Sequence, residues 1–316
     1  MDNFFDHAKA AEALNSWTES MTAVASTKDY MHQAALLDLS AFRVKRVDSS
    51  ITKVLARSES SRPEAIVIVV GVLKSLNLPP VKKNRAYLEI VGYNSKHFAA
   101  AMENIKDLAY SLASKFPSDI VEHWVPVPDT AEFGPTIGGS CRYFALGVDI
   151  APETKILFGK YVDPSGTLSH HLGNTVAYCI DNDVAYLCIK KDQYVKKDPA
   201  GFRVGDIVEM GFALVAFCQA SRNKDDKQIC KLVLRTLTFL DDSFAKAAFK
   251  ARRTNEANAM SVGSRPTQFP SLVKKRFDFH ELSSDNEDYP ETRRRMAAMR
   301  ISDKCIEMET SSNQCT

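Results

Sequence analysis

The residues best suited to catalysis gather at 138–141, where Ser140 and Cys141 follow two glycines. Either side chain could act as a nucleophile if a histidine lay beside it in the fold. Three histidines elsewhere in the chain are candidate bases: His123, His170 and His171. A nucleophile elbow has glycine two residues after the nucleophile, but Arg142 and Tyr143 stand there. A hydrolase or transferase using Gly138–Cys141 is therefore an alternative, and a glycine-rich turn that enters a strand is the plainer interpretation.

The sequence indicates neither a metal site nor a phosphate-cradling loop. His170 and His171 are adjacent but have no third ligand at useful spacing, which is typical of a polar loop. Gly138 and Gly139 are not followed by the Lys-Ser/Thr pair of a phosphate loop, and no GxGxxG occurs. We therefore expect no cofactor and no bound metal.

Basic and aromatic residues interleave between residues 186 and 235. OB-type folds bind single-stranded nucleic acid in this way: basic side chains contact the phosphates, and aromatic rings stack on the bases. Aspartates in the same stretch dilute the positive charge, so a charge-mixed surface is the plainer interpretation. The candidate nucleic-acid-binding residues are Lys190, Lys191, Tyr186, Tyr194, Arg222, Lys227, Lys231 and Arg235.

The composition of the 316 residues is that of a soluble globular protein, with 45% hydrophobic and 25% charged residues. A formal charge of +2 creates no general attraction to nucleic acid or to an anionic membrane. The longest apolar run, 65–73, is far shorter than the ~20 residues that span a bilayer. The seven cysteines are odd in number and lack zinc spacing, which favours free thiols in a reducing compartment. With no secretory signal, we expect a cytoplasmic or nuclear protein with no membrane association.

The strongest strand signal is a hairpin formed by residues 206–219 and 227–240, two runs rich in β-branched and large apolar residues. Large apolar residues change faces after Thr236, so we expect a bulge near Arg235 and Thr236, or at Gly211 on the partner strand. Strands of roughly 13 residues exceed the usual ~5–6 and suit a small closed barrel. A long hairpin in an ordinary antiparallel sheet is the alternative.

The same region carries a family resemblance. Its motifs are IDNDVAY at 180–186, FRVGDIVEM at 202–210 and LVLRTLTFLD at 232–241. Over about residues 176–250 the chain resembles a large family of uncharacterised proteins in mushroom-forming fungi. That family has a His-Thr pair where Cys179 and Ile180 stand here, so no role of that histidine carries over. The resemblance implies a fungal origin and brings no established activity.

In the first half of the chain, the sequence predicts mostly helices, with one strand at 85–93. Residues 1–60 are helix-prone and polar, with a second, weaker stretch at 29–37, and we interpret them as a helical arm. The run 65–73 suits a buried strand, but a proline near its start and a stop signal at 77–80 favour a helix. Residues 85–93 alternate as a strand does, and 96–116 form an amphipathic helix.

Further strands are predicted at 141–148 and 155–162, with a second hairpin in which 175–180 and 184–190 flank the turn 181–183. A short helix is predicted at 244–253, and the polar residues 254–316 are expected to be a disordered tail. The resulting fold class is α+β, with an antiparallel sheet or small OB-like barrel in a core domain at 65–253. The predicted function is a non-enzymatic binding or interaction module of unknown ligand, with an unknown protein as its expected partner. Single-stranded nucleic-acid binding is the first alternative, and the hydrolase or transferase is the second.

Overall fold

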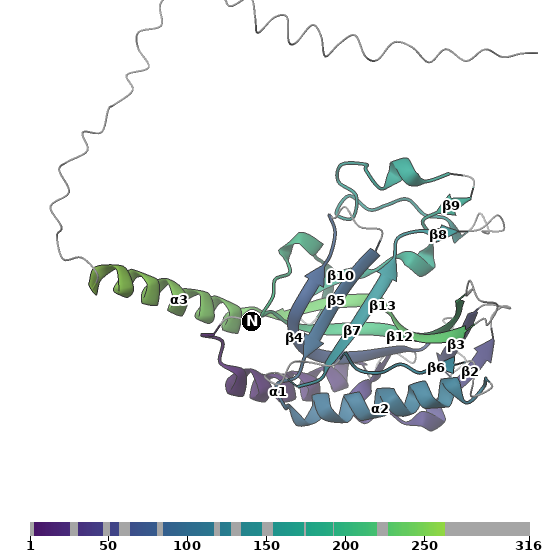
Figure 1. Cartoon of the computed structure of the whole chain (residues 1–316), viewed down its shortest axis with the longest axis horizontal. Helices are drawn as coiled ribbons and strands as arrows, with labels where there is room; N and C mark the ends of the chain where they lie inside the picture. Colours follow the sequence, from purple (N-terminus) through teal and green to yellow (C-terminus); the bar gives the residue numbers. More distant parts are fainter. Residues whose placement is uncertain are drawn as a thin grey trace, which may run out of the picture. The chain divides into compact units, whose positions relative to one another are not determined.

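The computed structural model of the protein describes residues 3–25, 31–46, 51–56, 64–80, 85–116, 121–127, 134–146, 154–173, 175–191, 193–219 and 227–262. This part contains three α-helices and a mixed sheet, which confirms the α+β class (Figure 1). The helices are α1 (His7–Ala25), α2 (Lys96–Ala113) and α3 (Ser243–Val262).

The main sheet has 11 strands in the described residues. They are β1 (Met31–Gln33), β2 (Phe42–Arg46), β3 (Ile51–Ala56), β4 (Ile66–Asn77), β5 (Arg85–Val91), β6 (Val121–Glu122), β7 (Thr136–Arg142), β10 (Ala185–Lys190), β11 (Gln193–Lys196), β12 (Ile207–Gln219) and β13 (Lys227–Asp241). Two short strands, β8 (Ala145–Leu146) and β9 (Val176–Ala177), pair separately. The sheet is mixed rather than antiparallel throughout, because β13 runs parallel to β6, β7 and β10 and β1 runs parallel to β4.

The predicted long hairpin is confirmed as β12 and β13, which are antiparallel along their whole length. The predicted bulge is also present. Gly211 pairs with Thr236 but the next residue, Phe212, pairs with Leu234, so Arg235 is the extra residue. Gly211 is needed here, because a Cβ at this position would lie 2.2 Å from Thr236 Oγ1. The bulge lets the large apolar residues on both sides of it face the core.

The central strands pair in a closed circuit. β12 pairs with β4, β4 with β5, β5 with β7 and β7 with β13, which pairs with β12 again. The β7–β13 contact is the shortest of these and joins Val233 to Ser140. Side chains from all five strands, among them Leu88, Met210 and Leu234, are buried in the main core.

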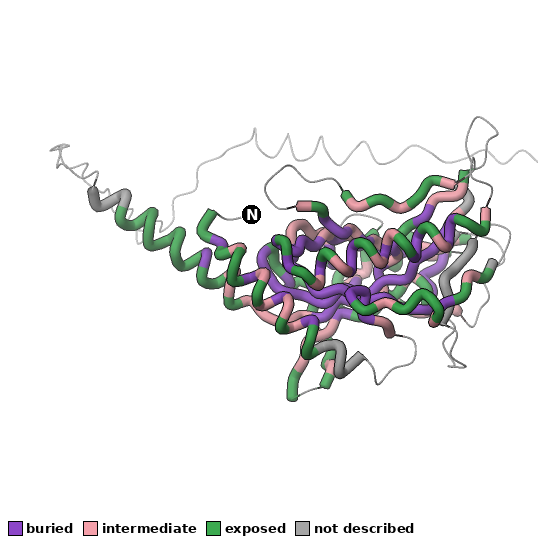
Figure 2. Tube along the Cα trace, turned by 90° about the horizontal axis from the view of Figure 1, so that it is seen from below, coloured by how far each residue is buried: buried purple, intermediate pink, exposed green. Residues whose placement is uncertain are grey.

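The predicted amphipathic helix is confirmed as α2, which closes one side of this core. Phe98, Met102, Ile105, Leu108 and Leu112 recur at helical spacing and are all buried. The helix begins at its N-cap, Ser95, whose hydroxyl accepts a hydrogen bond from the Phe98 N–H. The opposite side of α2 faces outward (Figure 2).

A smaller apolar cluster fixes α1 to the other face of β4. Phe5, Ala10 and Leu14 from the N-terminal segment are buried against Val70 and Val72. The expectation of a wholly helical arm at 1–60 is nevertheless wrong, because β1, β2 and β3 belong to the main sheet. The second helical stretch expected at 29–37 is instead β1 followed by a 3-10 turn at Ala34–Leu36.

The helix expected at 65–73 is also wrong, since these residues belong to β4. The strand lies between β5 and β12 and is buried on both faces, so its apolar run shows no alternation. Val67 and Val69 face the main core, while Val70 and Val72 face α1. The β-branched side chains suited to a two-sided strand outweighed the start and stop signals of a helix.

Three further expectations for the second half of the chain need correction. The hairpin around 181–183 does not form, because β9 pairs with β8 while β10 pairs with β13 and β11. Residues 155–162 contain only an isolated bridge, between Lys155 and Cys179. α3 is longer than the predicted helix, so residues 254–262 are helical and the expected tail is wrong there, while 263–316 lie outside the described residues. No helix among the described residues is long and apolar enough to cross a membrane.

Candidate functional site

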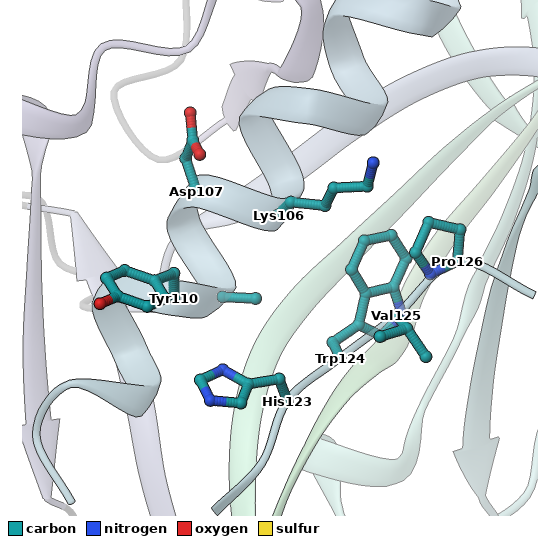
Figure 3. Close-up of a pocket in the computed structure, with 8 residues that line it drawn as sticks. Lys106, Asp107, Tyr110, His123, Trp124, Val125 and Pro126 are labelled. Carbon is teal, nitrogen blue, oxygen red and sulfur yellow. The ribbon is translucent and has the colours of Figure 1, made fainter. Parts of the chain in front are cut away.

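The candidate site is a hollow of about 320 Å³ between α2 and residues 121–127 (Figure 3). We call it the α2 groove. Its lining combines three aromatic rings, three apolar residues and two charged residues: Tyr110, His123, Trp124, Ala109, Val125, Pro126, Lys106 and Asp107. Its volume is within the range of ordinary ligand pockets.

Both walls of the α2 groove are held by the fold. On one side, Leu108, Ala109 and Leu112 anchor α2 in the main core. On the other, β6 is paired in parallel with β13, and Val127 exchanges backbone hydrogen bonds with Thr136. The groove therefore lies between two elements whose positions are fixed by packing and by sheet pairing.

The aromatic and apolar side chains of the groove are unusually exposed. Tyr110 and Val125 each leave 69% of their surface in contact with solvent. The Tyr110 ring stacks on His123, with centroids 6.0 Å apart and planes 14° from parallel. Trp124, by contrast, is half-buried and packs against the main core. An exposed aromatic pair beside an anchored tryptophan is typical of a surface that another molecule covers.

Of the charged groups at the rim of the groove, one carboxylate is in no ion pair with the described residues. Lys106 Nζ lies 2.7 Å from Glu103 Oε1, so these two groups neutralise each other. Asp107 has no ion pair within the part of the chain that the structure describes. The α2 groove is thus an aromatic and apolar hollow whose edge carries one carboxylate without an ion pair among the described residues.

A second hollow of about 360 Å³ continues along the same side of α2 toward its N-terminus. It shares Lys106 with the α2 groove and is lined further along by Tyr93, Phe98, Met102 and Pro135. The turn between β5 and α2 forms one end of this hollow, and it requires glycine at position 92. A Cβ on Gly92 would lie 2.2 Å from the Phe98 ring. Tyr93 and Asn94 follow with φ of 46° and 64°, a left-handed conformation that costs free energy in residues other than glycine.

The structure divides the residues predicted to bind nucleic acid. Tyr186 is 6% exposed and lies in the main core, so its ring is not available to a base. The Arg235 side chain is only 10% exposed, with Nη2 2.8 Å from Glu64 Oε1 and Nη1 donating to the carbonyl of Asp181. Arg222 lies outside the described residues.

The remaining members of that set lie near opposite ends of β13. Lys190 and Lys191 are exposed at the β10–β11 turn, where the register places Cys188 beside Phe239. Lys227 begins β13, 12 residues before Phe239, and Lys231 follows four residues later. At ~3.3 Å per residue, Lys227 and Lys231 lie about 40 Å and about 26 Å along the strand from Phe239, so they do not make one continuous patch with Lys190 and Lys191. Tyr194 is half-buried, and burial together with Glu209 raises the pKa of its hydroxyl.

The sequence 138–141 is part of strand β7, which separates the two candidate nucleophiles. Ser140 points to the outer face of the sheet, while Cys141 is buried in the main core. The thiol lies 3.4 Å from the carbonyl oxygen of Asn182, and burial raises its pKa to about 11. An activated cysteine has a lowered pKa, so this environment does not favour nucleophilic chemistry.

The three histidines are engaged elsewhere. His123 lines the α2 groove, and His171 packs its ring edge-on against Phe144. His170 and His171 form a 3-10 turn with Ser169, and no group of three potential metal ligands occurs among the described residues.

The sequence alone does not predict the α2 groove. In it, His123 stands out only as a candidate base, and the helix at 96–116 only as a core element. Tyr110 interrupts the polar face of that helix, and HWVP at 123–126 is an aromatic stretch followed by proline. These two features were the available signal, but nothing in one sequence places them side by side.

This chain matches no protein-family model and no curated protein.

Proposed function

We propose that this protein is a binding module that holds an extended segment of a partner protein in the α2 groove. The observation that carries the proposal is the exposure of Tyr110 and Val125 in a hollow beside the anchored Trp124. Burying such side chains under a partner removes apolar area from water, and aromatic residues dominate the free energy of most interfaces.

The dimensions favour an extended segment over a compact ligand. The two hollows follow α2 from Phe98 to Tyr110 and share Lys106. Over this stretch the helix rises about 18 Å, which about five or six residues of extended chain would cover at ~3.3 Å each. The lining offers apolar and aromatic surface along this length.

The charge at the rim defines the partner further. Because Lys106 is neutralised by Glu103, the carboxylate of Asp107 is available to a cation. We infer a partner segment with a large apolar or aromatic side chain for the groove and a lysine or arginine close by.

We also infer that the closed circuit of β4, β12, β13, β7 and β5 acts as a small barrel that keeps α2 in place. The circuit of pairings and the filled core support this inference.

The test selects displayed 12-residue random peptides on the immobilised full chain and measures the affinity of synthetic versions of the enriched sequences. We expect enrichment of peptides that combine aromatic or aliphatic residues with a basic residue. Tyr110→Ala should weaken binding about 30-fold, since hot-spot side chains contribute about 2 kcal/mol or more. Val125→Asp should weaken it as well, and Asp107→Asn should weaken only peptides that carry the basic residue.

A matched control separates the groove from general stickiness. Leu157 is 87% exposed and does not line the groove, so Leu157→Asp should leave peptide binding unchanged. Because Trp17 and Trp124 are the two tryptophans, Trp17→Phe leaves Trp124 as the single fluorophore in the groove. Peptide binding should then shift its emission. Absence of enriched peptides, or binding that tolerates both Tyr110→Ala and Val125→Asp, would refute the proposal.

A further inference from the structure

Three basic side chains share the outer face of the sheet where β5, β7 and β13 meet. Arg85 begins β5 and Arg142 ends β7, and the register makes them direct cross-strand partners. β13 runs parallel to β7 and contacts it at Val233 and Ser140. Lys231 is two residues before that contact and Arg142 is two residues after it, so the two charged groups come within electrostatic reach only through their long side chains. All three basic residues are exposed, while Ala86, Cys141 and Leu232 next to them face the core.

Within the described ranges, no acidic side chain is paired with any of the three. None of them has an ion pair or hydrogen bond to its side chain within the described ranges. Arg235, on the same strand as Lys231, shows the contrast, because its guanidinium is paired with Glu64. Like charges directly opposite each other across a β-ladder destabilise the sheet. The pairing of Arg85 with Arg142 therefore lowers the stability of the sheet, and no contact of the described fold requires two arginines there.

The two arginines act electrostatically on Lys231. The pKa of its ammonium is lowered, first by partial burial and then by the positive charges of Arg142 and Arg85. Glu122, from the adjacent β6, acts in the opposite direction and is the one carboxylate among the groups that influence Lys231. The cations therefore act on one another across a single surface, and an anion bound there would relieve their repulsion.

We propose that Arg85, Arg142 and Lys231 form a binding site for a phosphate group. Guanidinium groups donate paired, parallel hydrogen bonds to phosphate oxygens, and lysine adds a mobile point charge. Ser140 and Tyr87 are cross-strand partners on the same face, one step along the ladder from the arginine pair. Tyr87 already donates to Glu89, which leaves the Ser140 hydroxyl as the neighbouring donor. Glu122 on β6 limits the site on the Lys231 side and disfavours a long polyanion that continues past it.

This site is independent of the proposed peptide groove, because no residue of the trio lines it. The chemistry is shared by free phosphate and by a phosphate monoester on a small molecule, and two probes distinguish them. Inorganic phosphate and phenyl phosphate are each titrated into the full chain by calorimetry, with chloride keeping the ionic strength constant. We expect saturable binding with a Kd of about 1 mM or tighter for at least one probe. Tighter binding of phenyl phosphate would indicate an esterified ligand, and equal or weaker binding would indicate the free anion.

Variants assign the binding to the trio. Arg85→Gln, Arg142→Gln and Lys231→Gln should each weaken binding about tenfold, the loss expected for one charge-assisted contact. Lys196→Gln, at an exposed position on β11, is the matched control and should bind as the native protein does. Val125→Asp, which disables the proposed peptide groove, should also leave phosphate binding intact.

A second measurement guards against misfolded variants. Without phosphate, Arg85→Gln should keep or raise the melting temperature, because it removes the repulsion with Arg142. With phosphate, the native protein should melt at a higher temperature and this variant should not. No saturable binding of either probe, or equal weakening by Lys196→Gln, would overturn the proposal.

Discussion

The bulge at the centre of the β12–β13 hairpin predicts a specific coupling between Gly211 and Thr236. A Cβ on residue 211 would lie 2.2 Å from Thr236 Oγ1 and 3.2 Å from Ile66 Cγ2. Real Cβ contacts are about 1 Å longer than the first distance, so Gly211→Ala must displace Thr236 or the strand. Overpacking of this kind costs about 1–3 kcal/mol, while replacing glycine by alanine recovers about 0.4–1 kcal/mol through the unfolded state.

The net expectation is a loss of about 1–2 kcal/mol, or about 2–8 °C in melting temperature. Thr236→Ala should cost little by itself, because the buried Thr236 hydroxyl has no hydrogen-bond partner within the described structure. In the double variant the alanine methyl at 211 takes the space that the hydroxyl leaves. Gly211→Ala combined with Thr236→Ala should therefore recover most of the lost stability.

Urea unfolding of the two single variants and the double variant measures this coupling directly. Additive effects would show that the close approach at the bulge does not limit the packing. A Gly211→Ala protein as stable as the native chain would refute the reasoning outright, since it would mean that the hairpin accepts a side chain without adjustment.

Three other expectations follow from the buried polar groups. Tyr186→Ala should cost about 3–5 kcal/mol of stability in urea unfolding, because Tyr186 is a core residue, and a near-native stability would contradict its placement. Glu64→Gln should cost about 3 kcal/mol because it leaves the Arg235 guanidinium buried without its partner, whereas Glu103→Gln, at the exposed pair with Lys106, should change the melting temperature little. Iodoacetamide at pH 8 should modify Cys141 only after unfolding, since a pKa of about 11 leaves about one thiol in a thousand ionised, and rapid native-state labelling mapped by mass spectrometry would reopen the nucleophile hypothesis.

The parts of the fold that the sequence predicted are those with a periodic signal in a single element. The buried stripe of α2 and the alternation of β5 are local patterns, and both elements are confirmed. The bulge was predictable for the same reason, because a change of parity after Thr236 needs one extra residue to keep a single buried face.

The failures have a common physical origin in contacts between distant segments. β4 is buried on both faces by α1 and by the main core, which removes the alternation that identifies a strand. β10 pairs with β13 and β11 rather than with the preceding segment 175–180, because parallel pairing with the distant strand β13 was available. Neither outcome is encoded in the segment itself, so local turn signals such as 181–183 could not decide it.

The candidate sites show the same limit more sharply. Tyr186 and Arg235 suited a nucleic-acid surface by residue type, but the register turns Tyr186 into the core and the bulge directs Arg235 toward Glu64. Arg85 and Arg142 are 57 positions apart and become partners only through the β5–β7 ladder. Clustering along the chain therefore does not show which basic side chains share a surface. Our proposals rest instead on the basic side chains without a partner among the described residues and on the aromatic rings exposed beside α2.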